Sequence, residues 1–143
     1  MLSFSTFEFN IILMHTPIIF LTPKGFRGKG RYIGRSKNRR LGIFGNPFPV
    51  KKSKFSSKIY SLEESLTLYA RWIEDQYRSN SLFKEEADKL LKELKEKGHI
   101  TLDCWCVETA ISSEEHKPTK CHGEVLAVFL LRKISNNYKI VGG

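Results

Sequence analysis

All three cysteines of the chain lie in two short segments. Cys104 and Cys106 flank Trp105, and Cys121 follows after 14 intervening residues and directly precedes His122. Thiolates and imidazoles bind zinc, and they also act as nucleophiles and bases in enzymes. The sequence shows no secretory signal, so metal or thiol chemistry explains these cysteines better than a disulfide framework does. We therefore expect a functional site where the two segments meet.

Zinc binding is the first of three explanations for this cluster. Cys104, Cys106, Cys121 and His122 together form a Cys3His ligand set. The spacing is unusual for zinc, because residues i and i+2 of a flat strand place their Cα atoms roughly 6.6 Å apart. The adjacent Cys121 and His122 would also need a non-helical backbone to face one ion. A zinc cofactor therefore stays one alternative.

Thiol or acid–base catalysis is the second explanation. We expect Cys121 at the N-terminus of a helix, where the helix dipole lowers the pKa of a thiol and makes it a nucleophile. His122 or Asp103 would then act as the base. Asn46 would take part in the catalytic site and Arg35 would clamp a phosphate-bearing substrate through its planar guanidinium.

Simple burial is the third explanation. A free cysteine packs as a small hydrophobic residue. One face of the predicted strand carries Ile100, Leu102, Cys104 and Cys106, because they occupy every second position. His122 would then only cap a helix, and Trp105 would serve packing rather than stacking on a ligand. These three alternatives remain open from the sequence.

Positive charge is concentrated in one segment of the chain. Half of the 24 basic residues lie between Lys24 and Lys58, a stretch with no Asp or Glu, and the rest of the chain carries 12 basic and 15 acidic residues. Glycines and aromatic residues alternate with these cations, as in surfaces that bind phosphate and stack on bases. A nucleotide or nucleic acid is the expected partner, although a solvated loop would explain the charge as well. The expected phosphate-binding residues are Arg35, Lys37, Arg39 and Arg40.

Hydrophobic periodicity predicts an α/β fold, in which helices cover a small sheet. Ser61 and Glu64 have the spacing of a capping box, and Gly98 marks a helix end. In open sheets of this kind, ligands bind at the carboxyl ends of strands and at neighbouring helix N-termini. The predicted elements are strands at 18–22 and 31–34, helices from 61 to about 79 and from 81 to 97, a strand at 99–107, a loop at 108–120, a helix from 123 or 124, and a strand at 138–141.

Length and composition fit one domain. The chain has 143 residues, of which 41% are hydrophobic and 27% charged, so neither disorder nor membrane residence is expected. We expect residues 18–143 to form a single domain and residues 1–17 to be an extension, with Met14 as a second candidate start of translation. The odd number of cysteines and the lack of a targeting signal indicate a cytoplasmic protein.

Four short segments resemble a known family. They are Tyr32-Ile33-Gly34-Arg35, Gly45-Asn46-Pro47-Phe48, Cys104-Trp105-Cys106 and Cys121-His122-Gly123-Glu124-Val125-Leu126. In this order they are similar to the signature of a family of bacterial and phage proteins known as domain of unknown function 4326. The resemblance spans residues 32–130 and implies a small domain with a site drawn from these segments. It implies no activity.

Two functional hypotheses follow. The first is a small protein that binds a phosphate-containing ligand, a nucleotide or a nucleic acid, at a Cys/His/Asn/Arg site, with the question of catalysis left open. The second is a non-catalytic nucleic-acid-binding module in which a Cys3His zinc site only stabilises the fold.

Overall fold

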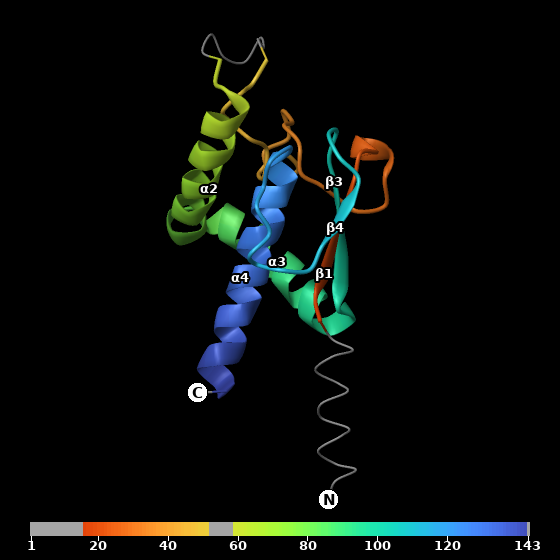
Figure 1. Cartoon of the computed structure of the whole chain (residues 1–143), viewed down its shortest axis with the longest axis vertical. Helices are drawn as coiled ribbons and strands as arrows, with labels where there is room; N and C mark the ends of the chain where they lie inside the picture. Colours follow the sequence, from red (N-terminus) through yellow and green to blue (C-terminus); the bar gives the residue numbers. More distant parts are fainter. Residues whose placement is uncertain (1–15, 52–58, 143) are drawn as a thin grey trace, which may run out of the picture.

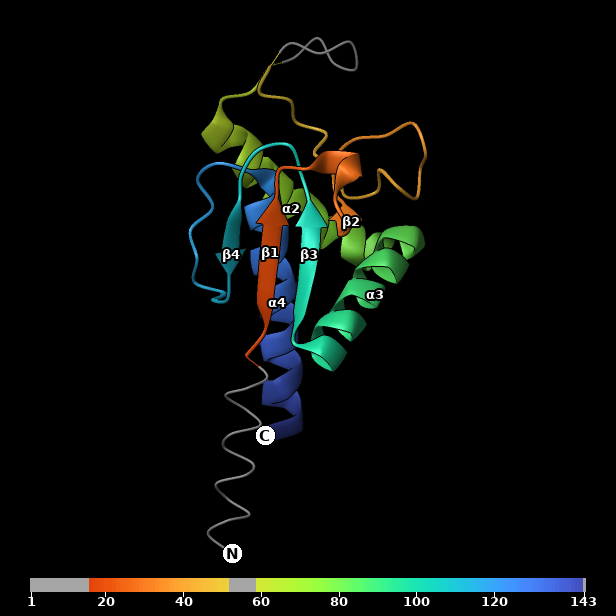
Figure 2. The ribbon, with the colours of Figure 1, turned by 90° about the vertical axis from the view of Figure 1, so that its right-hand side faces the viewer.

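A computed structural model describes residues 16–51 and 59–142, with the backbone alone for residues 137–142. Three helices pack on one face of a four-stranded sheet, as Figures 1 and 2 show from two sides. This arrangement confirms the predicted α/β fold. The described elements are β1 (Ile18–Thr22), η1 (Gly25–Arg27), β2 (Arg31–Tyr32), α2 (Leu62–Ser79), α3 (Ser81–Lys97), β3 (His99–Asp103), β4 (Thr109–Ile111) and α4 (His122–Gly142).

The sheet is mixed, with strand order β2-β3-β1-β4. β1 and β2 both pair with β3 in parallel, and β4 pairs with β1 in antiparallel orientation. The connection from β1 to β3 includes α2 and α3, as a parallel crossover requires. The carboxyl ends of the three parallel strands therefore meet at one edge of the sheet.

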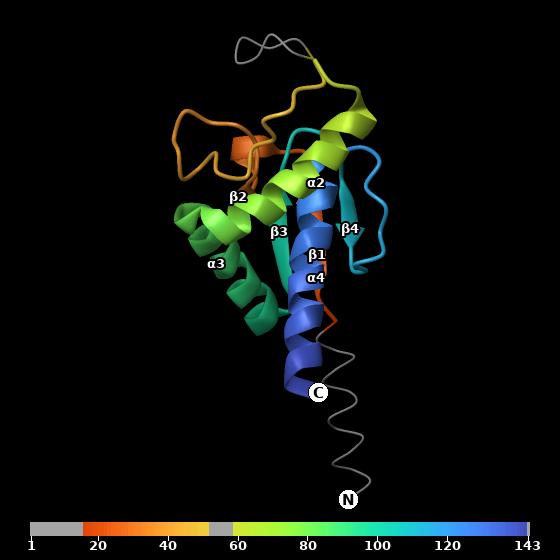
Figure 3. The same cartoon turned by 90° about the vertical axis from the view of Figure 1, so that its left-hand side faces the viewer.

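The core lies between the sheet and the helices. Ile19 and Leu21 of β1 and Ile100 and Leu102 of β3 are fully or almost fully buried, whereas Phe20 is 39% exposed on the opposite face. This alternation follows from the two-residue period of a strand. Figure 3 shows α2 and α4 crossing in front of the sheet on the covered face. Leu126, Phe129 and other apolar residues of α4 complete the core.

Local signals place the helix ends as predicted. Ser61 Oγ accepts a hydrogen bond from the Glu64 amide and the Glu64 carboxylate accepts one from the Ser61 amide, which is a complete capping box at the start of α2. Asn80 ends α2 and caps α3. Gly98 ends α3 with a φ of 80°, in the left-handed region that glycine adopts most readily.

Three predicted elements differ in the structure. β3 ends at Asp103 instead of continuing to Val107, because the chain bends out of the sheet after Cys104. The predicted loop contains β4, which is too short for its alternation to be visible in the sequence. The predicted last strand at 138–141 is wrong, because α4 continues through it. No Gly or Pro lies between Leu126 and Val141 to end the helix.

Within the part of the chain that the structure describes, no helix is both long and apolar enough to cross a membrane.

Candidate functional site

The residues of the four sequence segments meet at one pocket. It has a volume of about 650 Å³ and lies where Cys106, near the carboxyl end of β3, approaches Cys121 at the start of α4. The segments around Arg35 and Asn46 and the first turns of α2 complete its wall. The predicted location at strand ends and a helix N-terminus agrees with this geometry.

Glu124 organises the start of α4. Its Oε1 accepts hydrogen bonds from the amides of Lys120 (2.9 Å) and Cys121 (3.1 Å), and its Oε2 lies 2.7 Å from His116 Nε2. The Gly123 amide donates in turn to Cys121 Sγ at 3.3 Å. This is a reciprocal cap in which a thiol stands where serine is usual. Burial would raise the pKa of Glu124, but the hydrogen bonds from His116 and Lys120 outweigh it and lower the pKa.

The three thiols form a connected group. Cys104 and Cys121 are buried, and Cys106 is exposed. Interaction with Cys121 lowers the pKa of Cys104 to about 6 and that of Cys106 to about 7, although burial opposes both changes. The same interactions raise the pKa of Cys121.

The predicted direction of the Cys121 pKa shift is wrong. The pKa is raised rather than lowered, because the interactions with Cys104 and Cys106 exceed the effect of the Gly123 amide. The predicted orientation of Cys104 and Cys106 on one strand face is also wrong, since the bend after Cys104 buries one thiol and exposes the other. Cys106 is therefore the thiol that a ligand in the pocket would meet in its reactive thiolate form.

His122 lines the pocket but is held by the fold. Its Nε2 lies 2.8 Å from the carbonyl oxygen of Ile33, and its ring packs edge-on against Tyr69 with centroids 5.2 Å apart. A carbonyl only accepts hydrogen bonds, so Nε2 carries a proton. Burial lowers the pKa of His122; the Ile33 bond opposes this change and the charge of Arg35 adds to it. The imidazole is therefore neutral at pH 7.

The side chains of Asn46 and Asp103 are occupied by structural hydrogen bonds. Asn46 Nδ2 donates to Ser65 Oγ at 2.8 Å and its Oδ1 accepts from the Phe48 amide at 2.8 Å, which ties the loop to α2. Asp103 is buried and accepts from Thr22 Oγ1 at 2.7 Å and from the Gly30 amide at 2.9 Å. Asn46 reaches the pocket wall, whereas Asp103 anchors the loop before β2.

The cations of the pocket are only partly those predicted. Arg35, Lys51 and Lys120 line it, and no Asp or Glu does so in the described part of the chain. Lys37 and Arg39 are exposed but do not line the pocket. Lys51 and Lys120 were missed from the sequence; adjacency to Cys121 was a signal for Lys120, and Lys51 carried no signal beyond its place in the basic segment.

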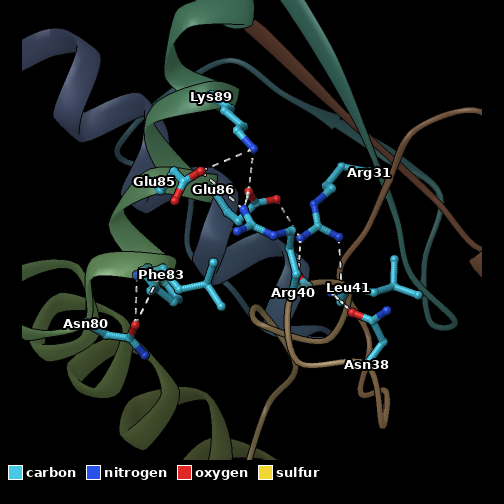
Figure 4. Close-up of polar contacts among 10 residues, drawn as sticks. Arg31, Asn38, Arg40, Leu41, Asn80, Phe83, Glu85, Glu86 and Lys89 are labelled. Atoms are coloured by element: carbon cyan, nitrogen blue, oxygen red, sulfur yellow. Dashed lines mark hydrogen bonds and ion pairs between the residues drawn. The ribbon is translucent and has the colours of Figure 1, made fainter.

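Arg40, predicted to bind phosphate, lies instead against α3. Its guanidinium is 2.7 Å from Glu86 Oε2 and 3.3 Å from Glu85 Oε1. Figure 4 shows that Arg31 and Lys89 approach Glu86 as well, at 3.4 Å and 2.8 Å. Arg31 also donates to the carbonyl oxygens of Arg40 and Leu41. These contacts fix the loop that contains the predicted basic residues onto α3.

Trp105 lies at the pocket with 60% of its surface exposed. Its Nε1 donates to the Tyr32 hydroxyl at 3.2 Å, and Phe26 and Tyr32 stand edge-on to its ring. A Cβ added at Gly25, whose φ is 54°, would lie 2.4 Å from the indole. Trp105 therefore packs against Phe26 and Tyr32, while a large part of its surface stays open to solvent.

The predicted Cys3His zinc set does not form a metal site in the structure. Among the residues described, no group of three or more His, Cys, Asp or Glu side chains is placed to hold a metal ion.

Comparison with known proteins decides the family. The profile of a family described as Domain of unknown function (DUF4326) matches residues 24–132. The chain belongs to the DUF4326 family. No curated protein and no solved structure gave a significant match. The DUF4326 match includes all four sequence segments and every residue of the pocket, so the pocket is built entirely within the family domain.

Proposed function

We propose that this pocket binds a phosphate-containing ligand of about the size of a nucleotide. The observation that carries the proposal is its charge: three cationic side chains, those of Arg35, Lys51 and Lys120, line it without an acidic one among the described residues. A concave surface of one sign concentrates ligands of the opposite sign. The positive end of the α4 dipole at His122 adds to this field.

Trp105 supports a ligand that carries an aromatic base. Its exposed indole stands in the same pocket as the cations, and stacking on such a ring contributes about 1–3 kcal/mol per base. The volume of about 650 Å³ lies within the range of small-molecule sites. Phosphate would lie toward Arg35, whose guanidinium offers a bidentate fork.

A binding experiment with matched variants tests the proposal. Adenosine diphosphate and adenosine would be titrated by calorimetry into the wild type, Arg35→Gln and Arg39→Gln. Both substitutions remove one exposed arginine charge, but only Arg35 lines the pocket. We expect the diphosphate to bind more tightly than the nucleoside, and Arg35→Gln to weaken the diphosphate about tenfold, the loss of one charge-assisted hydrogen bond.

The control separates the pocket from the general charge of the chain. Arg39→Gln should change the affinity less than twofold at moderate salt. Equal weakening by both variants would show that the basic loop, not the pocket, attracts the anion, as expected of a nucleic-acid-binding surface. Equal affinities for adenosine and its diphosphate would contradict a phosphate site.

A further inference from the structure

The three cysteines differ in exposure, and the proposed ligand site does not depend on this difference. Cys106 is exposed, whereas Cys121 is 2% exposed and Cys104 is completely buried. Cys106 and Cys121 both line the pocket, and Cys104 does not. Among the neighbours of Cys106, Cys121 has the largest effect on its pKa. A solute that enters the pocket therefore meets one thiol first and finds a second thiol in the same pocket.

We propose that Cys106 and Cys121 form a redox-active dithiol pair, in which a hydroperoxide oxidises Cys106 and Cys121 then closes an intrachain disulfide. The proposal concerns the protein itself and does not depend on the ligand proposed above. The difference in exposure and the shared pocket assign the two roles. The accessible sulfur reacts with the oxidant, and the buried one resolves the product.

The chemistry balances with hydrogen peroxide as the only co-reactant. The Cys106 thiolate attacks one peroxide oxygen; an S–O bond forms, the O–O bond breaks and hydroxide leaves, so sulfur loses two electrons and the peroxide gains them. The Cys121 sulfur then attacks the sulfenic sulfur of Cys106. An S–S bond forms, and the hydroxyl leaves as water with the proton of Cys121.

The surroundings favour both steps. Thiolate is the reactive species, and interaction with Cys121 lowers the pKa of Cys106. Once Cys106 is a neutral sulfenic acid, its thiolate no longer raises the pKa of Cys121. The Gly123 amide, 3.3 Å from Cys121 Sγ, then favours the thiolate that attacks.

Cys104 is the internal control of the assignment. Cys121 lowers the pKa of Cys104 as it lowers that of Cys106, but the Cys104 sulfur is enclosed in the core next to the Val107 carbonyl. A bridge between Cys104 and Cys121 would need no access to the pocket. A Cys106–Cys121 bridge would show that the oxidant reacts from the pocket. A Cys104–Cys121 bridge would show only that these three thiols oxidise readily.

The test treats the reduced full-length protein with a slight excess of hydrogen peroxide, blocks free thiols with iodoacetamide and locates bridge and label by tryptic peptide mapping. Cys104 and Cys106 fall in one tryptic peptide, so fragmentation between them identifies the labelled sulfur. We expect a Cys106–Cys121 disulfide with the label on Cys104. The Cys104→Ser variant should form the same bridge, and Cys121→Ser should stop at a Cys106 sulfenic acid that dimedone traps.

Three results would overturn the proposal. They are a Cys104–Cys121 bridge in the wild type, disulfides only between chains, and three thiols that remain free after the peroxide is consumed or has been present for hours. The wild-type map decides the matter alone, so a variant that fails to fold does not affect the conclusion.

Discussion

The thiols illustrate at the residue scale how contacts across the chain set chemistry. Cys121, which follows Cys106 after 14 other residues, lowers the pKa of Cys106, and the same interaction raises the pKa of Cys121. The helix N-terminus contributes one amide to Cys121, and its effect on the pKa is smaller than that of Cys104 and Cys106. Location at a helix start alone was therefore a poor guide to the pKa of Cys121.

An alkylation profile tests this assignment. Iodoacetamide should label Cys106 first, with a rate that rises with pH and is half-maximal near pH 7, because the thiolate forms above its pKa of about 7. Replacement of Cys121 by Ala removes this interaction and returns the pKa toward the ordinary 9.0, so labelling at pH 7 should fall about tenfold or more. Cys104→Ser should not slow it, since the Cys104 charge raises the pKa of Cys106. A wild-type midpoint above pH 8.5 would contradict the assignment.

Five of the residues predicted from the sequence for the site line one pocket. They are Arg35, Asn46, Cys106, Cys121 and His122. His122 and Asn46 form structural hydrogen bonds with Ile33 and Ser65. These partners are distant in sequence and follow no spacing rule, so the bonds could not be predicted.

Glu86 stabilises the basic loop at the scale of single elements. It is almost buried on α3 and receives Arg31, Arg40 and Lys89. Burial would raise its pKa, but the hydrogen bonds from Lys89 and Arg40 and the charge of Arg31 outweigh burial and lower it. Two residues of the basic segment, Arg31 and Arg40, thus position the loop after β2, and this loop leads to Asn46 and the pocket.

Replacement of Glu86 by Gln should lower the free energy of unfolding by about 2 kcal/mol in urea, because it leaves a partly buried arginine without its counter-charge. Glu85→Gln is the matched control: Glu85 is 54% exposed and contacts Arg40 and Lys89 only at the surface, so we expect a loss below about 1 kcal/mol. Similar losses in both variants would show that the Glu86 network adds nothing.

The same variant has a distinct pH dependence. The pKa of Glu86 is lower in the folded protein than its ordinary 4.5, so its contribution is complete above that value and is lost as pH falls through the lowered folded pKa. The stability difference between wild type and Glu86→Gln should therefore shrink in this acid range. Urea unfolding at several pH values measures it.

Elements with local signals were predictable, and those without them were not. The capping box at Ser61 predicted the start of α2, and Gly98 predicted the end of α3. β3 was predicted too long because the alternation of apolar residues continues past Asp103, where the backbone already turns. β4 forms only because β1 offers it an edge, which is a tertiary cause.

At the scale of the whole molecule, the cations of the basic segment lie in different environments. Arg31 and Arg40 are paired with α3, while Arg35 and Lys51 line the pocket together with Lys120, Cys106 and Cys121. Net charge alone did not reveal this distribution. Because of this distribution, we place the proposed anion site in the pocket, within the DUF4326 domain, and not on the entire basic surface.

The most direct test of this central claim is a ¹⁵N spectrum of the tryptophan indole groups during titration with adenosine diphosphate. The chain has two tryptophans; Trp105 lines the pocket, whereas Trp72 packs against Tyr69 and Phe83 and does not line it. Binding in the pocket predicts a saturable shift of the Trp105 indole signal with Trp72 unchanged, and loss of that shift in Arg35→Gln but not in Arg39→Gln. Saturable binding that leaves the Trp105 signal in place would contradict the claim.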